Sequence, residues 1–298
     1  MVSLSLSEFA SYANKRVTSF MRSYVSSLDD DVPSLKQGLE YALLIGGKRA
    51  RPLLVYATGR LFNTDDKLLD HPAAAVECVH SYSLVHDDMP EMDNDTLRRG
   101  NPTVHVKFGQ AGALLIGDTL QVLAFQILSD PASGIDPASC VKLINLLSHG
   151  AGYEGMCGGQ QLDLEAEHKH LALEPLKLLH SKKTGALIRA SVLMGARCGG
   201  ERDPEVWKVL DKYSRLVGLA FQIWDDVMDV TEDSATLGKN AGSDLKEEKS
   251  TYPSLMGVDE AVRYAKKTAS EAKDALLSIK GDTSILMQFA DFTVSRDH

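Results

Sequence analysis

Cysteine is scarce in this sequence. Its 298 residues include only Cys78, Cys140, Cys157 and Cys198, and no two of them are spaced as a pair. Disulfide frameworks and structural zinc sites both depend on paired cysteines, so neither class of protein fits. The scattered thiols indicate a protein that keeps them reduced, as in the cytoplasm.

Targeting and membrane-spanning signals are also lacking. Residues 1–15 do not combine a basic start with an unbroken apolar run, which a secretory signal requires. The longest apolar stretch, residues 111–128, carries Asp118, Gln121 and Gln126. Polar side chains are costly in a bilayer, so the stretch predicts a buried helix rather than a membrane span. We therefore expect a cytoplasmic protein that needs no membrane.

Positive charge is in short supply. Lysine and arginine total 32 against 41 aspartates and glutamates, which gives a formal net charge of −9. A nucleic-acid backbone rewards lysine and arginine, so general nucleic-acid binding is not expected. A smaller phosphate ligand would need a local basic cluster or bound divalent cations.

Strand-like alternation is rare, whereas helical spacing of apolar residues runs along nearly the whole chain. This pattern predicts an all-α fold, a helical bundle whose short connections make neighbouring helices mostly antiparallel. No linker-like segment divides the chain, so we expect a single domain over residues 1–298. The expected helices span residues 5–27, 34–45, 52–61, 71–89, 109–128, 137–156, 174–197, 203–230, 258–279 and 284–296.

One acidic cluster, Asp225, Asp226 and Asp229, follows an apolar stretch. Residues three and four apart share one side of a helix, so these carboxylates can converge. The intervening residues of 221–228 are largely apolar. Buried like charges are costly unless a cation binds them, and magnesium prefers carboxylate oxygens together with water and substrate phosphates. The cluster therefore predicts a magnesium site.

A second acidic cluster contains Asp87, Asp88 and Asp93. Pro90 disfavours helical geometry at the residue before it, so Asp93 is expected to return from a turn. Two arginines follow shortly after, and their guanidinium groups could grip a diphosphate that is bridged to metal. Either cluster alone would most simply be a solvated helix end. Both clusters follow strongly apolar helices, however. If they were ordinary solvated helix ends, this unusual combination would have to occur twice in one chain.

Basic residues gather at several points. The segment Gly46-Gly47-Lys48-Arg49-Ala50-Arg51-Pro52 adjoins an expected helix start, where free backbone N–H groups also favour phosphate. Its spacing is not that of a P-loop, and a short basic run is more often solvated surface. Further phosphate donors could come from Lys182-Lys183-Thr184, from Lys239 and from Lys249-Ser250-Thr251, the last two in the long irregular stretch 232–250.

These residues resemble the trans-isoprenyl diphosphate synthase family in order over nearly the whole chain. The matching segments are GGKRARP at 46–52, HDDMPEMDNDTLRRGNPT at 86–103, GGQQLDL at 158–164, KTGALI at 183–188, FQIWDDVMD at 221–229, LGK at 237–239 and KSTYP at 249–253. The resemblance is strongest to bacterial short-chain farnesyl diphosphate synthases. It implies a bundle of the isoprenoid synthase type with a deep central cavity and the two acidic clusters facing each other across its mouth.

The resemblance also implies roles for the site residues. Three magnesium ions would be held by Asp87, Asp93 and Asp225, while Asp88, Asp226 and Asp229 would orient or support these ligands. The residues implied at the allylic diphosphate are Arg98, Lys183, Lys239 and, closing the site, Lys249. Those implied at isopentenyl diphosphate are Lys48, Arg51, His80 and Arg99, and those facing the reacting carbons are Thr184 and Gln222.

The implied reaction is the condensation of isopentenyl diphosphate with dimethylallyl and geranyl diphosphate to give farnesyl diphosphate. Magnesium and the cations would stabilise the departing diphosphate, so that the allylic C–O bond ionises. The released diphosphate would remove the final proton, so no protein base is needed. Tyr82 and Ser83 lie about one helical turn before Asp87, where a bulky ring would shorten the cavity. We therefore expect a C15 product, with a C20 product as the alternative.

Other classes remain open at this point. A catalytically idle prenyl synthase partner subunit usually lacks aspartates from one cluster, whereas all six are present here. A terpene cyclase shares the fold and the metals but has no need of Lys48 and Arg51. Calcium-stabilised structural clusters would show no turnover with magnesium and both diphosphates. The family also suggests a homodimer.

Overall fold

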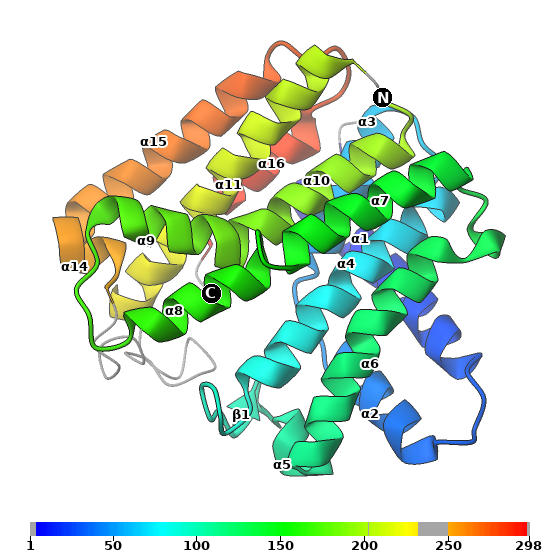
Figure 1. Cartoon of the computed structure of the whole chain (residues 1–298). Coiled ribbons are helices and arrows are strands. Elements are labelled where there is room, and N and C mark those ends of the chain that lie inside the picture. Colours follow the sequence, from blue (N-terminus) through cyan, green and yellow to red (C-terminus); the bar gives the residue numbers. More distant parts are fainter. Residues whose placement is uncertain (1–3, 202, 232–249, 297–298) are drawn as a thin grey trace.

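The computed structural model describes residues 4–201, 203–231 and 250–296, and these residues form an all-α bundle, as predicted (Figure 1). The only strands in this part of the chain are β1 (Leu97–Arg98) and β2 (Asn101–Pro102), which pair antiparallel. The α-helices are α1 (Leu6–Ser26), α2 (Pro33–Leu44), α3 (Ala50–Leu61), α4 (Asp66–Asp87), α5 (Val104–Phe108), α6 (Gln110–Ser129), α7 (Pro137–Ala151), α8 (Met156–Ala166), α9 (Leu173–His180), α10 (Ala186–Cys198), α11 (Pro204–Thr231), α14 (Tyr252–Met256), α15 (Val258–Leu276) and α16 (Ser284–Phe292). A short 3₁₀ turn, η1, spans Pro131–Ser133, and a π-helical segment, η2, spans Ser181–Gly185.

The outer helices follow the apolar periodicity of the sequence. In α1 the buried residues recur every fourth position, from Phe9 through Ala13 and Val17 to Val25, so one stripe faces the core. The helix begins at Ser5, whose hydroxyl accepts a hydrogen bond from the backbone N–H of Glu8, while the Glu8 carboxylate accepts one from the backbone of Ser5. This reciprocal capping box fixes the start of the helix where the sequence predicts it.

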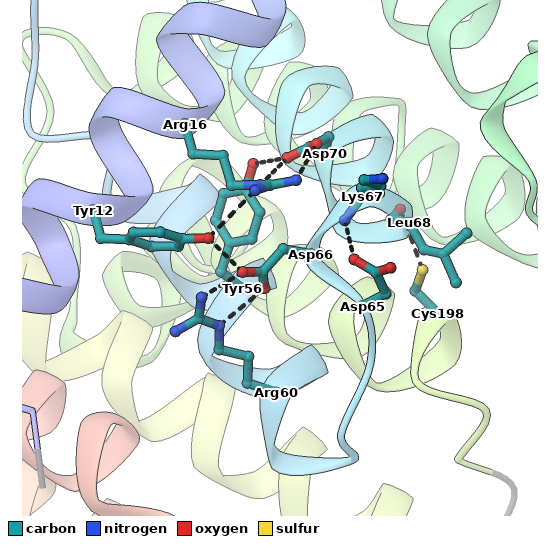
Figure 2. Close-up of polar contacts among 10 residues, drawn as sticks. All are labelled: Tyr12, Arg16, Tyr56, Arg60, Asp65, Asp66, Lys67, Leu68, Asp70 and Cys198. Atoms are coloured by element: carbon teal, nitrogen blue, oxygen red, sulfur yellow. Dashed lines mark hydrogen bonds and ion pairs between the residues drawn. The ribbon is translucent and has the colours of Figure 1, made fainter. Parts of the chain in front are cut away.

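Helices α4 and α10 lie at the centre of the bundle. Nearly every residue of their middle turns is buried, because α4 packs against α3, α6 and α10. Pro72 lies inside α4 and has no N–H group to donate to the carbonyl of Leu68. The thiol of Cys198, at the end of α10, donates to that carbonyl at 3.4 Å instead (Figure 2). The central pair of helices is therefore joined at the point where the proline weakens α4.

Two expected helices are interrupted. The helix expected over residues 137–156 ends at Ala151, and α8 starts at Met156 after a turn that contains Gly152 and Gly155. A Cβ atom at Gly155 would lie 2.2 Å from the carbonyl oxygen of Gly150, so this turn requires glycine. The helix expected over residues 174–197 is divided into α9 and α10 by the π-helical segment η2.

The apolar stretch 111–128 forms α6, as predicted, but the expectation that this helix is buried is only half right. One face packs against α4, where the ring of His86 fits against Gly117. The opposite face exposes Leu114, Leu115 and Val122. By length and composition α6 is the one helix of the described residues that could cross a membrane, and less than half of its apolar window is buried. Core helices pass the same test, so this carries little weight for a membrane span.

Candidate active site

The two acidic clusters lie at the C-terminal ends of α4 and α11, which both point toward the lower half of Figure 1. Segment η2 connects them. The positive charge of Lys183 in η2 lowers the pKa of Asp87. The hydroxyl of the next residue, Thr184, donates to Gln222 Oε1 at 2.8 Å. Gln222 in turn donates to Asp226 Oδ1 at 3.0 Å. Both clusters therefore lie near η2 and not on opposite faces of the molecule.

Asp87 is a half-buried carboxylate without enough compensating positive charge. Its pKa is raised to about 6, chiefly by burial and also by the nearby carboxylates of Asp93 and Asp88. Lys183 and Arg98 oppose this rise but do not cancel it. The turn after α4 holds Asp93 close by, because its backbone N–H donates to the carbonyl of Asp87 at 2.9 Å. A divalent cation at this point would relieve the repulsion.

Asp88 has a different partner from Asp87. It is only 2% exposed, and Arg98 at the end of β1 donates to it through Nε at 2.8 Å and through Nη2 at 2.5 Å. Burial raises the pKa of Asp88, and the hydrogen bonds from Arg98 partly offset that rise. The two-point contact fixes the plane of the guanidinium group. Asp88 thus positions Arg98, which fits the supporting role that the family resemblance implies.

In the second cluster, Asp226 is fully engaged by the protein. It accepts hydrogen bonds from Gln222 and, at 3.0 Å, from the backbone N–H of Tyr252 at the start of α14. Asp229 is buried on the same helix. Asp225 is the more accessible carboxylate, and Arg296 Nη2 lies 2.6 Å from its Oδ1. A cation therefore already neutralises the expected metal ligand of α11.

Segment η2 places Lys183 and Thr184 between the clusters. The Lys183 ammonium lies 2.5 Å from Asp163 Oδ2 of α8. A Cβ atom at Gly159 would lie 2.1 Å from the backbone nitrogen of Lys183, so glycine lets α8 approach η2 closely. π-helical insertions often occur at functional sites because they re-aim side chains within a helix. The segments GGQQLDL and KTGALI are thus parts of one local structure.

The residues implied at isopentenyl diphosphate also come together. Burial, followed by the charges of Arg51 and Arg99, lowers the pKa of His80 well below its usual value, so this imidazole is neutral. The guanidinium of Arg99 donates to the carbonyl of Gly46 and lies against Gly47, where a Cβ atom would meet it at 2.6 Å. Burial lowers the pKa of Arg51, and the negative charges of Glu77 and Asp225 oppose that effect. Three of the four implied residues thus share one basic cluster.

Lys48 points toward the C-terminal helix. Its ammonium group lies 5.8 Å from the centre of the Phe292 ring of α16. It lines a groove of about 860 Å³ between α1, the start of α3 and α16. Lys239 and Lys249 lie outside the described residues, so their expected phosphate contacts stay predictions.

Tyr82 and Ser83 occupy the turn of α4 before Asp87, as predicted. The Tyr82 ring is buried, and its hydroxyl lies 3.2 Å from Cys157 Sγ of α8. Burial raises the pKa of Tyr82, so the hydroxyl stays protonated. The Ser83 hydroxyl donates to the carbonyl of His80 at 2.9 Å. The ring therefore lies between α4 and α8, and the cavity expected beneath Asp87 stays a prediction.

The donor set suits magnesium better than a cation held by protein alone. Among the described residues, no three acidic, histidine or cysteine side chains are grouped to hold a metal ion. Magnesium is usually bound through one or two carboxylates together with water and substrate phosphates. The pKa of Asp87 is raised by burial and by the charges of Asp93 and Asp88, which a bound cation would offset. The residues therefore fit a metal that arrives with a phosphorylated ligand.

Sequence reasoning missed three participants. Asp163 holds Lys183, Glu77 faces the basic cluster, and Arg296 contacts Asp225. Arg296 also donates to the carbonyl of Phe221 at 2.8 Å and stacks 3.5 Å from the centre of its ring. Asp163 lies in the segment GGQQLDL at 158–164, so the family resemblance already pointed to this region of the sequence. Helical periodicity gave no signal for Arg296, because it lies beyond Phe292, at which the helix expected over residues 284–296 ends, and its partner lies on α11.

Comparisons with known proteins agree with this geometry. The polyprenyl synthetase family matches residues 32–280. The farnesyl diphosphate synthase of Escherichia coli K12 is 46% identical over 287 residues, which cover 95% of this chain and 96% of that protein. The Haemophilus influenzae farnesyl diphosphate synthase is 42% identical, covering 97% and 98% of the two chains.

A solved structure extends the comparison to ligands. The geranyltransferase of Helicobacter pylori, complexed with magnesium and isoprenyl diphosphate, has a TM-score of 0.83 and 34% identity, and the match covers 98% of both chains. The family match covers most of the chain, and the curated relatives are matched over nearly their whole length. The chain therefore belongs to the polyprenyl synthetase family of prenyl-transferring enzymes.

Proposed function

We propose that this enzyme condenses isopentenyl diphosphate with dimethylallyl and then geranyl diphosphate to give (2E,6E)-farnesyl diphosphate. The observation that carries the proposal is that η2 lies near both acidic clusters: the charge of Lys183 lowers the pKa of Asp87, and Thr184 is linked through Gln222 to Asp226 by hydrogen bonds. Its curated relatives that bear the name farnesyl diphosphate synthase support the product.

At the allylic end, Asp87, Asp93 and Asp225 would hold magnesium, and we propose three ions for each site. When bound, magnesium supplies Lewis-acid stabilisation of the leaving diphosphate. Lys183 and Arg98, held by Asp163 and Asp88, present fixed positive charges to the same group. Lys239 and Lys249 complete this set in the proposal. Arg296 lies against Oδ1 of Asp225, and we propose that it moves away when that carboxylate binds a metal.

At the isopentenyl end, we assign the diphosphate to Arg51, Arg99, His80 and Lys48. The neutral His80 can donate one hydrogen bond without adding charge. Thr184 and Gln222, which are bonded to each other, lie between the two ends and would face the reacting carbons. We find no need for a protein base, since the released diphosphate can accept the proton.

Product length is assigned to the turn that carries Tyr82 and Ser83. A buried ring that is fixed against α8 would stop a growing chain one turn below Asp87. The C15 product follows from this ring. Geranylgeranyl diphosphate is the product expected if the ring can swing aside.

The test is to incubate the purified protein with labelled isopentenyl diphosphate, magnesium and either dimethylallyl or geranyl diphosphate, and to size the products by chromatography. We expect farnesyl diphosphate from both starters. A dominant C20 product would overturn the chain-length assignment. No product from either starter would overturn the enzymatic proposal and favour a non-catalytic partner subunit.

We further propose a cytoplasmic homodimer acting as one domain, with no nucleic-acid partner. The exposed face of α6, with Leu114, Leu115 and Val122, would bury apolar surface in a dimer, and α7, which contacts α6, exposes a further valine, Val141. Light scattering after gel filtration should give twice the mass of one chain. Val122→Lys should yield monomers, whereas Leu277→Lys, at an exposed leucine after α15, should not. A wild-type monomer would contradict the dimer.

A further inference from the structure

Glu77 is a buried carboxylate in the middle of α4, and no motif of the sequence singles it out. It is 2% exposed, and Arg49 Nη1 lies 2.5 Å from its Oε1. Both side chains of this pair are 3% exposed. An ion pair buried to this extent recovers little net stability from its charges, because both ions lose their hydration. Net stabilisation of the fold therefore does not explain why this ion pair is buried here.

Arg49 connects this carboxylate to the segment that carries the isopentenyl-site cations. Its backbone has a φ of 51°, a left-handed conformation that is unfavourable for a residue with a side chain, and it is the residue at which α3 begins. Its second nitrogen donates to the carbonyl of Leu43 at the end of α2. The side-chain contacts thus hold the backbone between Lys48 and Arg51 in a strained turn.

The same carboxylate also compensates the neighbouring guanidinium groups. Burial lowers the pKa of Arg51, and Glu77 is the strongest of the charges that oppose this. Glu77 likewise acts on Arg99, whose pKa is lowered by burial and by the charge of Arg49. His80, one turn further along α4, experiences Arg49, Arg51 and Arg99 together. Glu77 is therefore the counter-charge around which the cluster is assembled.

The pair is not satisfied as a purely structural ion pair would be. Within the described residues, Glu77 Oε2, Arg49 Nε and Arg51 Nε are buried without a hydrogen-bond partner. By contrast, both oxygens of Asp70, earlier on the same helix, accept hydrogen bonds from Arg16, and Oδ1 also accepts one from Tyr56. Unsatisfied buried polar groups are uncommon and concentrate at functional sites.

We propose that Glu77, acting through Arg49, is a positioning residue for isopentenyl diphosphate. It does not touch the substrate. It holds the turn that leads into α3 and limits the repulsion among Arg49, Arg51 and Arg99. The guanidinium groups are thereby held in place before a diphosphate binds. This inference rests on the proposed function of the site, and it adds the element that assembles its isopentenyl half.

The test is Glu77→Gln, with Asp70→Asn as the matched control on the same helix. Positioning predicts that Glu77→Gln raises the KM for isopentenyl diphosphate about tenfold or more, leaves the KM for geranyl diphosphate within about twofold, and leaves kcat within about threefold. Loss of a negative charge alone would tighten diphosphate binding, so the two effects have opposite signs. Asp70→Asn should change neither KM.

A second variant separates positioning from folding. Replacing both partners, Arg49→Met with Glu77→Met, keeps the net charge and removes the cost of leaving one buried ion alone. We expect thermal stability close to wild type together with a raised KM for isopentenyl diphosphate. Wild-type kinetics in this double variant, or an unchanged KM in Glu77→Gln, would overturn the proposal. If neither variant folds, the pair is a folding element and the proposal fails.

A binding measurement keeps this inference apart from the proposed function. Calorimetric titration of isopentenyl diphosphate into wild type and Glu77→Gln, with magnesium and inorganic diphosphate present, reports affinity without turnover. We expect a Kd raised about tenfold in the variant. An inactive wild type would overturn the farnesyl assignment, whereas equal Kd values would overturn the role of Glu77.

Discussion

The two ends of α4 carry the same residue types and use them differently. At its start, Asp66 binds Arg60 and Tyr12, and Asp70 binds Arg16 and Tyr56 (Figure 2). At its end, Asp87 sits among other carboxylates with Lys183 as the main opposing charge. Both carboxylates at the first end accept hydrogen bonds from arginine and tyrosine side chains, whereas at the second end Arg98 holds Asp88 and the pKa of Asp87 stays raised.

The pKa values of two aspartates express this difference. Burial would raise the pKa of Asp66, but the hydrogen bonds from Arg60 and Tyr12 outweigh it and lower the pKa. Burial raises the pKa of Asp87 to about 6, and its cationic neighbours do not reverse this. The helix end that stabilises the fold is neutralised internally, and the end that we propose to bind metal keeps an aspartate with a raised pKa. The same kind of substitution should therefore have opposite effects at the two ends.

The largest expected effect is on catalysis. Asp87→Asn removes a proposed magnesium ligand and should lower kcat by about 10³-fold or more with geranyl diphosphate. Asp70→Asn, at the other end, should keep kcat within about twofold. Steady-state assays with magnesium check both. Similar losses in the two variants would mean that the ends do not differ in function.

The next effect is on stability. Asp70→Asn breaks the two-point ion pair with Arg16, whose side chains are 12% and 27% exposed, and weakens the bond from Tyr56. We expect the free energy of unfolding to fall by about 3 kcal/mol, measured by urea denaturation. Lys208→Ala, which removes an exposed ion pair with Glu205, should leave the free energy of unfolding almost unchanged. A loss no greater than that control would contradict the structural role of Asp70.

A smaller effect, of opposite sign, is expected from Asp87→Asn in the metal-free protein. Because the folded pKa of Asp87 is about 6 and its ordinary value is 3.8, the folded state binds more protons between these pH values. Its contribution to the free energy of unfolding therefore falls as pH rises from about 4 to about 6, and stays constant above.

Thermal unfolding in EDTA tests this sign. Above pH 6, Asp87→Asn should stabilise the protein by an amount of the order of 2 kcal/mol, and the advantage should disappear near pH 4. Magnesium with diphosphate should stabilise the wild type more than the variant. A variant less stable than wild type at pH 7 would show that Asp87 carries no excess charge.

The smallest expected effect on rate concerns the turn before Asp87. Tyr82→Ala removes the ring that contacts Cys157 and should lengthen the product from C15 toward C20, with kcat within about tenfold of wild type. Chromatography of the released chains measures it. Ser83→Ala is the companion variant, and its loss of a bond to the His80 carbonyl should leave the product at C15. An unchanged product in Tyr82→Ala would remove that residue from chain-length control.

Much of this fold follows from apolar periodicity. The stripe of α1 and the apolar middle of α4 are visible in the sequence because burial imposes their spacing. The break between α7 and α8 is not visible in the same way, since it depends on how closely Gly155 approaches the backbone of the preceding turn. Segment η2 also escapes periodicity, because a π-helical segment changes the register without ending the helix.

The site shows the same limit. The acidic clusters at the ends of α4 and α11 stand out in the sequence, because several aspartates close together beside a run of apolar residues are unusual. The partners that hold the cations could not, because Arg49 meets Glu77 and Lys183 meets Asp163 only after the helices pack. The contact of Arg296 with Asp225 joins residues 71 positions apart. Sequence identified the charges in excess, and only the packing revealed which of them are neutralised.

A crystal structure with magnesium, isopentenyl diphosphate and an unreactive allylic diphosphate analogue would show directly whether the two acidic clusters share metal ions. We predict carboxylate oxygens of both Asp87 and Asp225 at about 2.1 Å from magnesium ions, with Arg296 displaced from Asp225. Ions bound elsewhere, with Arg296 still paired to Asp225, would contradict this prediction.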